Sequence, residues 1–187
     1  MRTKLLIVGA SCLLVGSLRA AGDLERQAAE AVAAHQLVEA RTHYRALAEQ
    51  DPANTDYQIW VGRLSSWLND YPTATATFDR VLAADATNVE ALLGKAYVAM
   101  WQEQFAPAHD LLARAARAAP ENAEVQLGLA RNYHFQSKDR EAAEHVARVL
   151  ALDPGSTEAQ ELQRRLAPEP KRRGFFAKLK QLFTGRS

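Results

Sequence analysis

The chain has 187 residues, of which 48% are apolar and 24% charged, a composition that is ordinary for a globular protein and excludes wholesale disorder. Its net charge of +1 argues against a nucleic-acid-binding protein, which would carry a clear basic excess. A single cysteine excludes a disulfide framework and a zinc site built from several cysteines.

The small net charge conceals three segments of opposite sign. Residues 1–22 carry three basic residues and no acid. Residues 23–167 carry 14 Lys and Arg against 21 Asp and Glu, a net charge of −7. Residues 168–187 carry six basic residues against one acid, a net charge of +5. We therefore interpret the three segments separately.

Residues 1–22 have the three-part organisation of a secretory signal peptide. A basic start over residues 1–4 precedes an apolar run over 5–18, and the small residues 20–22 follow Arg19. As a helix with a rise of ~1.5 Å per residue, this run spans about 21 Å, less than a ~30 Å hydrocarbon core. We expect cleavage near residues 20–22 and export to the periplasm. The alternatives are a retained anchor, a buried helix, or lipidation at Cys12.

The middle segment repeats itself with a period of about 34 residues. Shifting the sequence by one period aligns four blocks, residues 21–54, 55–88, 89–122 and 123–156. Equivalent positions hold large aromatic residues, small alanines and asparagines that close the blocks: Trp67, Trp101, Phe135; Ala74, Ala108, Ala142; and Asn54, Asn88, Asn122.

Apolar residues at helical spacing predict two helices in each block, separated by a short polar turn. The expected helices cover 55–68, 72–84, 89–102, 105–118, 123–136 and 139–152. A further helix over 157–167 begins near Thr157 and places Leu162 and Leu166 on one face. Because a repeat array needs a polar end, we expect this last helix to cap it.

The period and its phases resemble the tetratricopeptide repeat, a helix–turn–helix unit of about 34 residues. Residues at the family's small, aromatic and closing proline phases carry the resemblance: Gly62, Ala96, Ala130, Phe78, Pro52, Pro120 and Pro154. It covers about 136 residues and is weakest in the first block. The resemblance implies an all-α fold, a right-handed superhelical solenoid of about four repeats within residues 23–167, with a capping helix.

The resemblance also implies a concave groove lined by the first helix of each repeat. The candidate partner-binding residues in this groove are Ile59, Arg63, Leu93, Tyr97, Met100, Leu127, Arg131 and His134. Such a mixed lining suits an extended peptide or a polar polymer. The alternative is that Ile59, Leu93 and Leu127 pack between helices while the arginines are merely solvated.

Repeat domains of this family that bind the carboxylate tail of cytosolic chaperones carry Lys and Asn at the fifth and ninth positions of the block. This chain has the pairs Ile59/Arg63, Leu93/Tyr97 and Leu127/Arg131 at those positions. The sequence therefore disfavours a cytosolic chaperone adaptor.

Trp67, Trp101 and Phe135 recur near the end of each first helix, followed by a short polar turn. This pattern is similar to repeats in periplasmic regions of bacterial exopolysaccharide-export and related outer-membrane proteins. We expect the three aromatic side chains to fill gaps between repeats, with carbohydrate stacking as the alternative.

Known catalytic motifs are absent from the sequence. The five histidines are scattered, and there is no HExxH, GxSxG, GxGxxG or phosphate-binding loop. We therefore expect no enzymatic activity, no cofactor and no metal site.

Residues 168–187 form a basic amphipathic tail. A basic run precedes a segment whose apolar residues fall on one helical face: Lys171, Arg172, Arg173, then Phe175, Phe176, Leu179, Leu182 and Phe183, with Lys178 and Lys180 elsewhere. The pattern is typical of a helix that binds an anionic membrane surface. The alternatives are docking, on a partner or on the chain's own acidic repeats, and a disordered tail.

Together these features predict a non-enzymatic scaffold in the bacterial cell envelope. We expect it to bind a protein or peptide partner through the concave groove, while the tail contacts a membrane or a partner. The alternative is a periplasmic accessory module for polysaccharide binding or export. A nucleic-acid partner is not expected.

Overall fold

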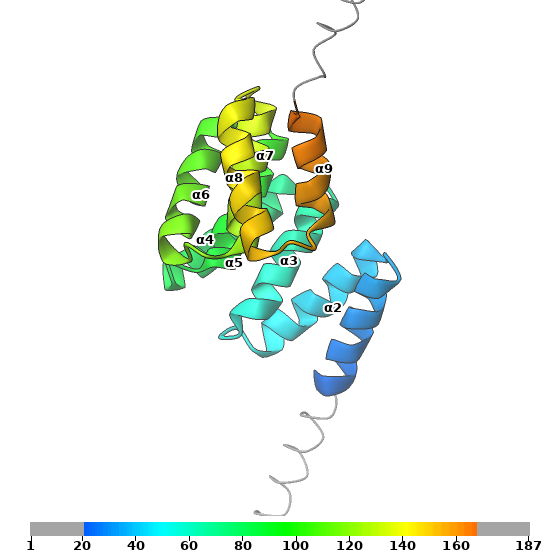
Figure 1. Ribbon diagram of the computed structural model, residues 1–187. Coiled ribbons are helices and arrows are strands. Elements are labelled where there is room, and N and C mark those ends of the chain that lie inside the picture. Colours follow the sequence, from blue (N-terminus) through cyan, green and yellow to red (C-terminus); the bar gives the residue numbers. More distant parts are fainter. Residues whose placement is uncertain (1–20, 168–187) are drawn as a thin grey trace, which may run out of the picture.

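The computed structural model describes residues 21–167, and this part of the chain consists of helices joined by short turns (Figure 1). A helical stretch that reaches residue 33 comes first. The helices that follow are α2 (Leu37–Gln50), α3 (Thr55–Trp67), α4 (Tyr71–Ala84), α5 (Val89–Trp101), α6 (Phe105–Ala118), α7 (Ala123–Phe135), α8 (Asp139–Leu152) and α9 (Thr157–Leu166). These bounds agree with the expected helices to within one residue at either end, and the all-α fold class is confirmed.

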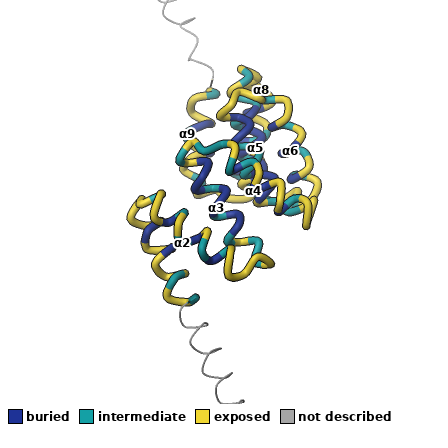
Figure 2. The backbone as a smooth tube through the Cα atoms, turned by 180° about the vertical axis from the view of Figure 1, so that it is seen from behind, coloured by how far each residue is buried: buried dark blue, intermediate teal, exposed yellow. Residues whose placement is uncertain are grey.

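Successive helices pack against one another, and the first helices of neighbouring repeats, α3, α5 and α7, also lie side by side. Buried residues are concentrated where the helices face each other (Figure 2). The second helix of every repeat carries a buried side chain at the same position of the repeat: Tyr44, Phe78, Leu112 and Val146. Neighbouring repeats therefore bury apolar side chains against one another, as stacked units that cannot bury both faces alone require.

A side chain caps the start of each first helix from α3 onward. Asn54, Asn88 and Asn122 accept hydrogen bonds from backbone N–H groups in the first turns of α3, α5 and α7. Ser156 does the same for α9 by accepting from the Ala159 N–H, and the helix begins at Thr157 as expected. These caps pair backbone donors that a helix start leaves without partners.

The turn inside each repeat contains one residue in the left-handed region. His35, Asn69, Glu103 and Ser137, which occupy the same phase of the repeat, have φ between 57° and 60°. The following residue donates its N–H back into the preceding helix, as Asp70 does to the Ser65 carbonyl at 2.8 Å. This arrangement ends the first helix and reverses the chain at the same place in every repeat.

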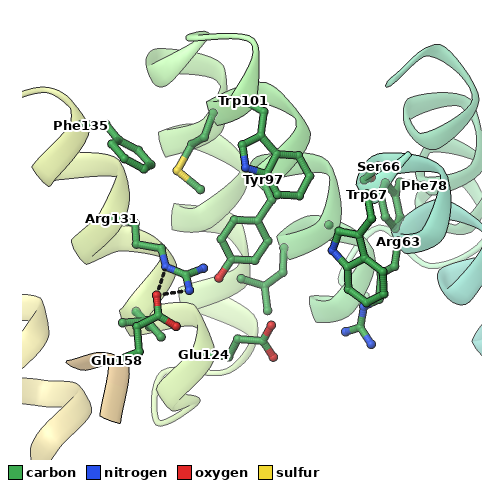
Figure 3. Close-up of a pocket in the computed structure, with 14 residues that line it drawn as sticks. Arg63, Ser66, Trp67, Phe78, Tyr97, Trp101, Glu124, Arg131, Phe135 and Glu158 are labelled. Atoms are coloured by element: carbon green, nitrogen blue, oxygen red, sulfur yellow. Dashed lines mark hydrogen bonds and ion pairs between the residues drawn. The ribbon is translucent and has the colours of Figure 1, made fainter. Parts of the chain in front are cut away.

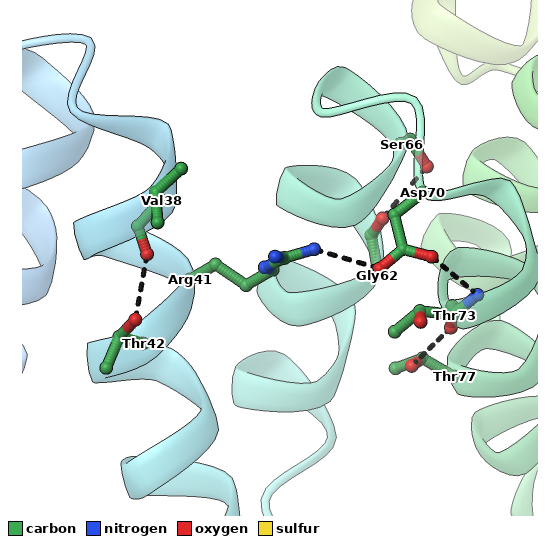
Figure 4. A network of polar contacts seen from close by, with 8 residues as sticks. All are labelled: Val38, Arg41, Thr42, Gly62, Ser66, Asp70, Thr73 and Thr77. Carbon is green, nitrogen blue, oxygen red and sulfur yellow. Dashed lines mark hydrogen bonds and ion pairs between the residues drawn. The ribbon is translucent and has the colours of Figure 1, made fainter.

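An ion pair joins the first repeat to the second (Figure 4). Arg41 of α2 contacts the carboxylate of Asp70 at 3.0 Å, and the same carboxylate accepts a hydrogen bond from the Thr73 N–H at the start of α4. The hydrogen bond from Thr73, together with the charge of Arg41, lowers the pKa of Asp70. The carboxylate therefore stays ionised as it caps α4 and contacts α2.

The last described helix, α9, covers the end of the array. Ala159 and Leu162 are buried against Val146 and Val149 of α8. The rest of α9 is mostly polar and exposed, which is what a terminal unit needs. Within residues 21–167, none of the helices has the length and apolar character needed to cross a membrane.

Candidate functional site

The first helices α3, α5 and α7, together with α9, border a cavity of about 600 Å³ (Figure 3). Six of the eight expected groove residues line it: Arg63, Leu93, Tyr97, Met100, Leu127 and Arg131. The repeat phases thus bring side chains from three separate blocks to one site. The volume falls in the range of sites that hold ligands or short peptide segments.

Ile59 does not line the cavity, which corrects its expected position. Its side chain is only 2% exposed and packs with Ala74, Phe78 and Val81 of α4. The fifth position of α3 therefore faces the second helix of its own repeat. Leu93, at the equivalent position of α5, is buried to the same extent but still reaches the cavity wall.

His134 lies beside the cavity rather than in its wall. It lines a smaller adjoining pocket of about 160 Å³, between α7 and α9, which shares Arg131, Phe135 and Glu158 with the main cavity. The His134 Nδ1 lies 3.3 Å from the Asp139 carboxylate. The expected groove residues therefore divide between two connected pockets, apart from Ile59.

Arg131 is held from two sides at one end of the cavity. Its Nε donates to the Glu158 carboxylate at 2.5 Å, and its Nη2 contacts the same oxygen. The guanidinium carbon lies 5.3 Å from the ring centre of Tyr97, a cation–π distance. Burial raises the pKa of Tyr97 even though Arg131 opposes the shift, so the phenol stays neutral and able to donate a hydrogen bond.

Glu158 was not among the expected groove residues. It lies one repeat period after Glu124, which also lines the cavity, so the repeat phase extended into the capping helix would have identified it. The expected groove residues stop at α7, because the sequence pattern of residues 157–167 predicts only a cap. The structure shows that α9 also supplies one wall of the site.

A second arginine–glutamate pair lies further along the groove. Arg63 of α3 contacts Glu90 of α5 at 3.1 Å, and its guanidinium carbon lies 5.7 Å from the ring centre of Trp60. Both pairs join the first helices of adjacent units. The two arginines are therefore largely neutralised by the protein itself, contrary to the alternative that they are merely solvated.

Trp67, Trp101 and Phe135 are the last residues of α3, α5 and α7, and all three line the cavity. They are 45%, 46% and 55% exposed, so they fill gaps between repeats only in part. Trp101 does pack between repeats, because it stacks on Tyr97 and on Tyr71 of the preceding unit, each with a centroid distance of 6.3 Å. The result is a row of three half-exposed aromatic side chains, one from each of α3, α5 and α7, along one edge of the groove.

The described residues contain no cluster of three or more His, Cys, Asp or Glu side chains arranged to hold a metal ion. The cavity wall is mainly apolar and aromatic, and its polar side chains are Arg63, Ser66, Tyr97, Glu124, Arg131 and Glu158. Apolar surface with a few polar side chains is typical of ligand-binding sites.

Residues 99–166 match the sequence family described as tetratricopeptide repeat. No curated protein matches the chain in sequence. The match runs from the end of α5 through the fourth block to the end of α9, and the similarity of the remaining part to such repeats is visible in the fold.

Solved structures of tetratricopeptide-repeat proteins share this fold. A thermophilic TPR protein from Thermus thermophilus has a TM-score of 0.71 at 17% identity, over 78% of this chain and 80% of that one. MamA from Desulfovibrio magneticus RS-1 (41-end) has a TM-score of 0.61 at 19% identity, over 89% and 97%. The first TPR of Spaghetti (RPAP3), bound to an HSP90 peptide, has a TM-score of 0.58 at 20% identity, over 63% and 93%. At these identities the similarity establishes the helical solenoid fold.

Proposed function

We propose that the chain is a non-enzymatic scaffold of the bacterial cell envelope that binds a segment of a partner protein in its concave groove. The observation that carries this proposal is the convergence of Tyr97, Met100 and Leu127, with three half-exposed aromatic residues, on one cavity. Aromatic side chains around a concave apolar site are the commonest anchors for protein partners.

The fold is typical of peptide-binding scaffolds, and one similar structure holds an HSP90 peptide. This chain has no Lys and Asn at the fifth and ninth positions of its first helices, and its groove arginines are paired with Glu90 and Glu158. A free carboxylate would compete with those glutamates for the same guanidinium groups. We therefore infer that the partner segment binds mainly through apolar and aromatic side chains.

The envelope location in this proposal depends on the expected signal peptide. The expected signal peptide, residues 1–22, lies almost wholly outside the described residues, so it rests on the sequence pattern. N-terminal sequencing of the protein from a bacterial periplasmic fraction tests it. A mature chain that begins near residues 20–22 supports export, and an intact N-terminus in the cytosolic fraction contradicts it.

Substitution of a groove aromatic tests the partner site. Trp101→Ala should reduce the partner recovered from an envelope extract by roughly tenfold or more, because a buried aromatic anchor contributes about 2 kcal/mol. Leu152→Ala is the matched control, since Leu152 is 43% exposed on α8 and does not line the cavity. Equal recovery of the same proteins with both variants would contradict binding in the groove.

The exposed tryptophans favour one second candidate, the binding of a polysaccharide by a periplasmic accessory module. Trp67 and Trp101 are half-exposed and line the cavity one repeat apart, where their indole rings can contact sugar rings of a bound chain. Titration with oligosaccharides, followed by tryptophan fluorescence, should then shift the emission in a Trp101-dependent manner. An unchanged emission at saturating oligosaccharide removes this candidate.

A further inference from the structure

We propose that, in the free protein, the groove is occupied by the basic amphipathic segment of the same chain, residues 171–183. This segment lies outside the described residues, so the argument comes from where the described chain ends and from what the groove offers. The inference goes beyond the proposed function and does not depend on it, because the segment can occupy the groove whether or not an external partner exists.

The described chain leaves α9 at the edge of the groove that carries the aromatic row. Trp67, Trp101 and Phe135 are the C-terminal residues of α3, α5 and α7. The start of α9 lies one repeat period after the start of α7, and the pocket between them is lined by Phe135 of α7 and Arg165 of α9. The C-terminal ends of α7 and α9 therefore lie together, and the described chain ends close to Phe135.

The length of the connection suits docking within one molecule. Neighbouring first helices lie roughly 10 Å apart, which places Trp101 about 20 Å from the end of α9. The eight residues from 167 to 175 span up to about 26 Å when extended. Phe175 can therefore reach Trp101, and a helix over 175–183, about 13 Å long, continues towards Trp67.

The chemistry of the segment matches that of the groove. One helical face of residues 175–183 would carry three phenylalanines and two leucines, which fit the half-exposed aromatic row. The segment belongs to a tail of net charge +5, and residues 23–167 carry −7. Arg63 and Arg131 are paired with Glu90 and Glu158, which reduces their repulsion of the incoming lysines.

Because the segment belongs to the same chain, a weak affinity is enough for it to occupy the groove. A helix as short as 175–183 is marginal in water on its own, so its apolar face gains by docking. A short linker raises the local concentration of the segment to roughly the millimolar range, so that modest intrinsic affinity fills the groove. A partner that binds the groove must then displace the segment, which makes the tail a competitive inhibitor within the molecule.

Site-specific photo-crosslinking of the full chain tests the position of the segment. The variant Phe176→p-benzoylphenylalanine is irradiated, and the products are mapped by mass spectrometry. We expect crosslinks within one chain to peptides that contain Met100–Trp101 or His134–Phe135, with a yield that does not change on dilution. Crosslinks to the second helices, crosslinks only between chains, or none to α3, α5 or α7 would overturn the proposal.

Tryptophan quenching gives an independent measurement, because two of the three tryptophans line the cavity. Phe175→Ala/Phe176→Ala in the full chain should increase quenching by acrylamide, whereas Thr184→Ala, the matched control in the same tail, should not. Equal quenching in all three proteins would overturn the proposal. So would a tail that pellets with phosphatidylglycerol vesicles in a Phe176-dependent manner while the groove crosslink is absent without vesicles.

Discussion

The ring of Phe78 lies directly against the backbone of Gly94. A Cβ atom added at Gly94 would come within 2.5 Å of Cε1 of this ring, and one added at Gly62 within 2.6 Å of the same atom. The aromatic side chain of α4 is thus held between two first helices at positions that have no side chain. Gly128 and Leu112 repeat this relationship in the next unit, with a distance of 2.7 Å to Cδ2.

The substitution Gly94→Ala should therefore destabilise the protein, although Ala normally stabilises a helix relative to Gly by up to about 1 kcal/mol. The added methyl group must displace the fully buried Phe78, and overpacking of this kind costs roughly 1–3 kcal/mol. Urea unfolding followed by circular dichroism measures the change. Gly155→Ala is the control, since its Cβ would meet only Asp153, at 3.4 Å. Unchanged stability of the Gly94 variant would show that the ring moves without cost.

The sequence predicts the helices well because their boundaries are local. Asparagine caps and the repeat period determine where each first helix begins, and the left-handed turn determines where it ends. The period also identifies which residues share a phase, and this is enough to place six groove residues on one cavity. Residues in one phase can therefore be grouped from the sequence alone.

The exposure of residues that share one position of the repeat could not be predicted, because it depends on the neighbouring side chains. Ile59, Leu93 and Leu127 share one position, yet Ile59 is enclosed by the core around Phe78, whereas Leu127 is only partly buried. The exposure of Trp67 and Trp101 likewise depends on what the next unit places beside the helix end. The repeat period predicts which way a side chain points, whereas its exposure depends on the side chains packed around it.

The Asn88 cap gives a second test. Its Oδ1 accepts a hydrogen bond from the Ala91 N–H at 2.9 Å, at the start of α5. Asn88→Ala should lower the free energy of unfolding by about 1 kcal/mol, because it leaves a backbone donor of the first turn without its partner. Asn88→Asp should retain most of the stability, since a carboxylate accepts the same bond and is favoured by the helix dipole. Equal losses in both variants would show that the cap contributes little.

A glycine in place of one of the left-handed turn residues should stabilise the fold. Glu103 has φ of 59°, a conformation that strains a residue with a long side chain. Glu103→Gly should raise the free energy of unfolding, by up to about 1 kcal/mol after the greater freedom of glycine in the unfolded chain is counted. Asn69→Gly, at the equivalent turn, should gain much less because asparagine tolerates this region. Thermal unfolding of the two variants compares them, and a larger gain at Asn69 would contradict the argument.

His145 predicts a pH dependence of stability. Its ring stacks on Tyr133 with a centroid distance of 5.5 Å, and its Nδ1 lies 2.9 Å from the Gln126 amide oxygen. Burial, followed by the charge of Arg148, lowers the pKa of His145 below its ordinary value of 6.5. The unfolded chain therefore binds this proton first, so the stabilisation present above pH 6.5 is lost as the pH falls through the lowered pKa.

Urea unfolding of the parent and of His145→Gln at pH 8 and pH 5.5 measures this contribution. The parent should lose more stability between the two pH values than the variant, whose side chain does not titrate. The histidine contribution lies above the range in which Asp70 and Asp85 titrate, because the pKa values of both carboxyl groups are lowered from 3.8. Equal losses in parent and variant would contradict a neutral, half-buried His145.

Asn132 is a polar residue at a position of the repeat that is apolar in the two preceding repeats. Its side chain is fully buried in α7, where the equivalent residues are the apolar Leu64 and Val98, and neither amide atom makes a hydrogen bond within the described residues. A buried polar group without a partner costs roughly 1–3 kcal/mol. Asn132→Leu, similar in shape to the amide and matching the equivalent Leu64, should raise the free energy of unfolding by about that amount. Asn132→Ala should gain less, because it leaves a void. A loss of stability with leucine would mean that the amide has a partner in solution, and binding assays on the same variant would then show whether that partner lies in the groove.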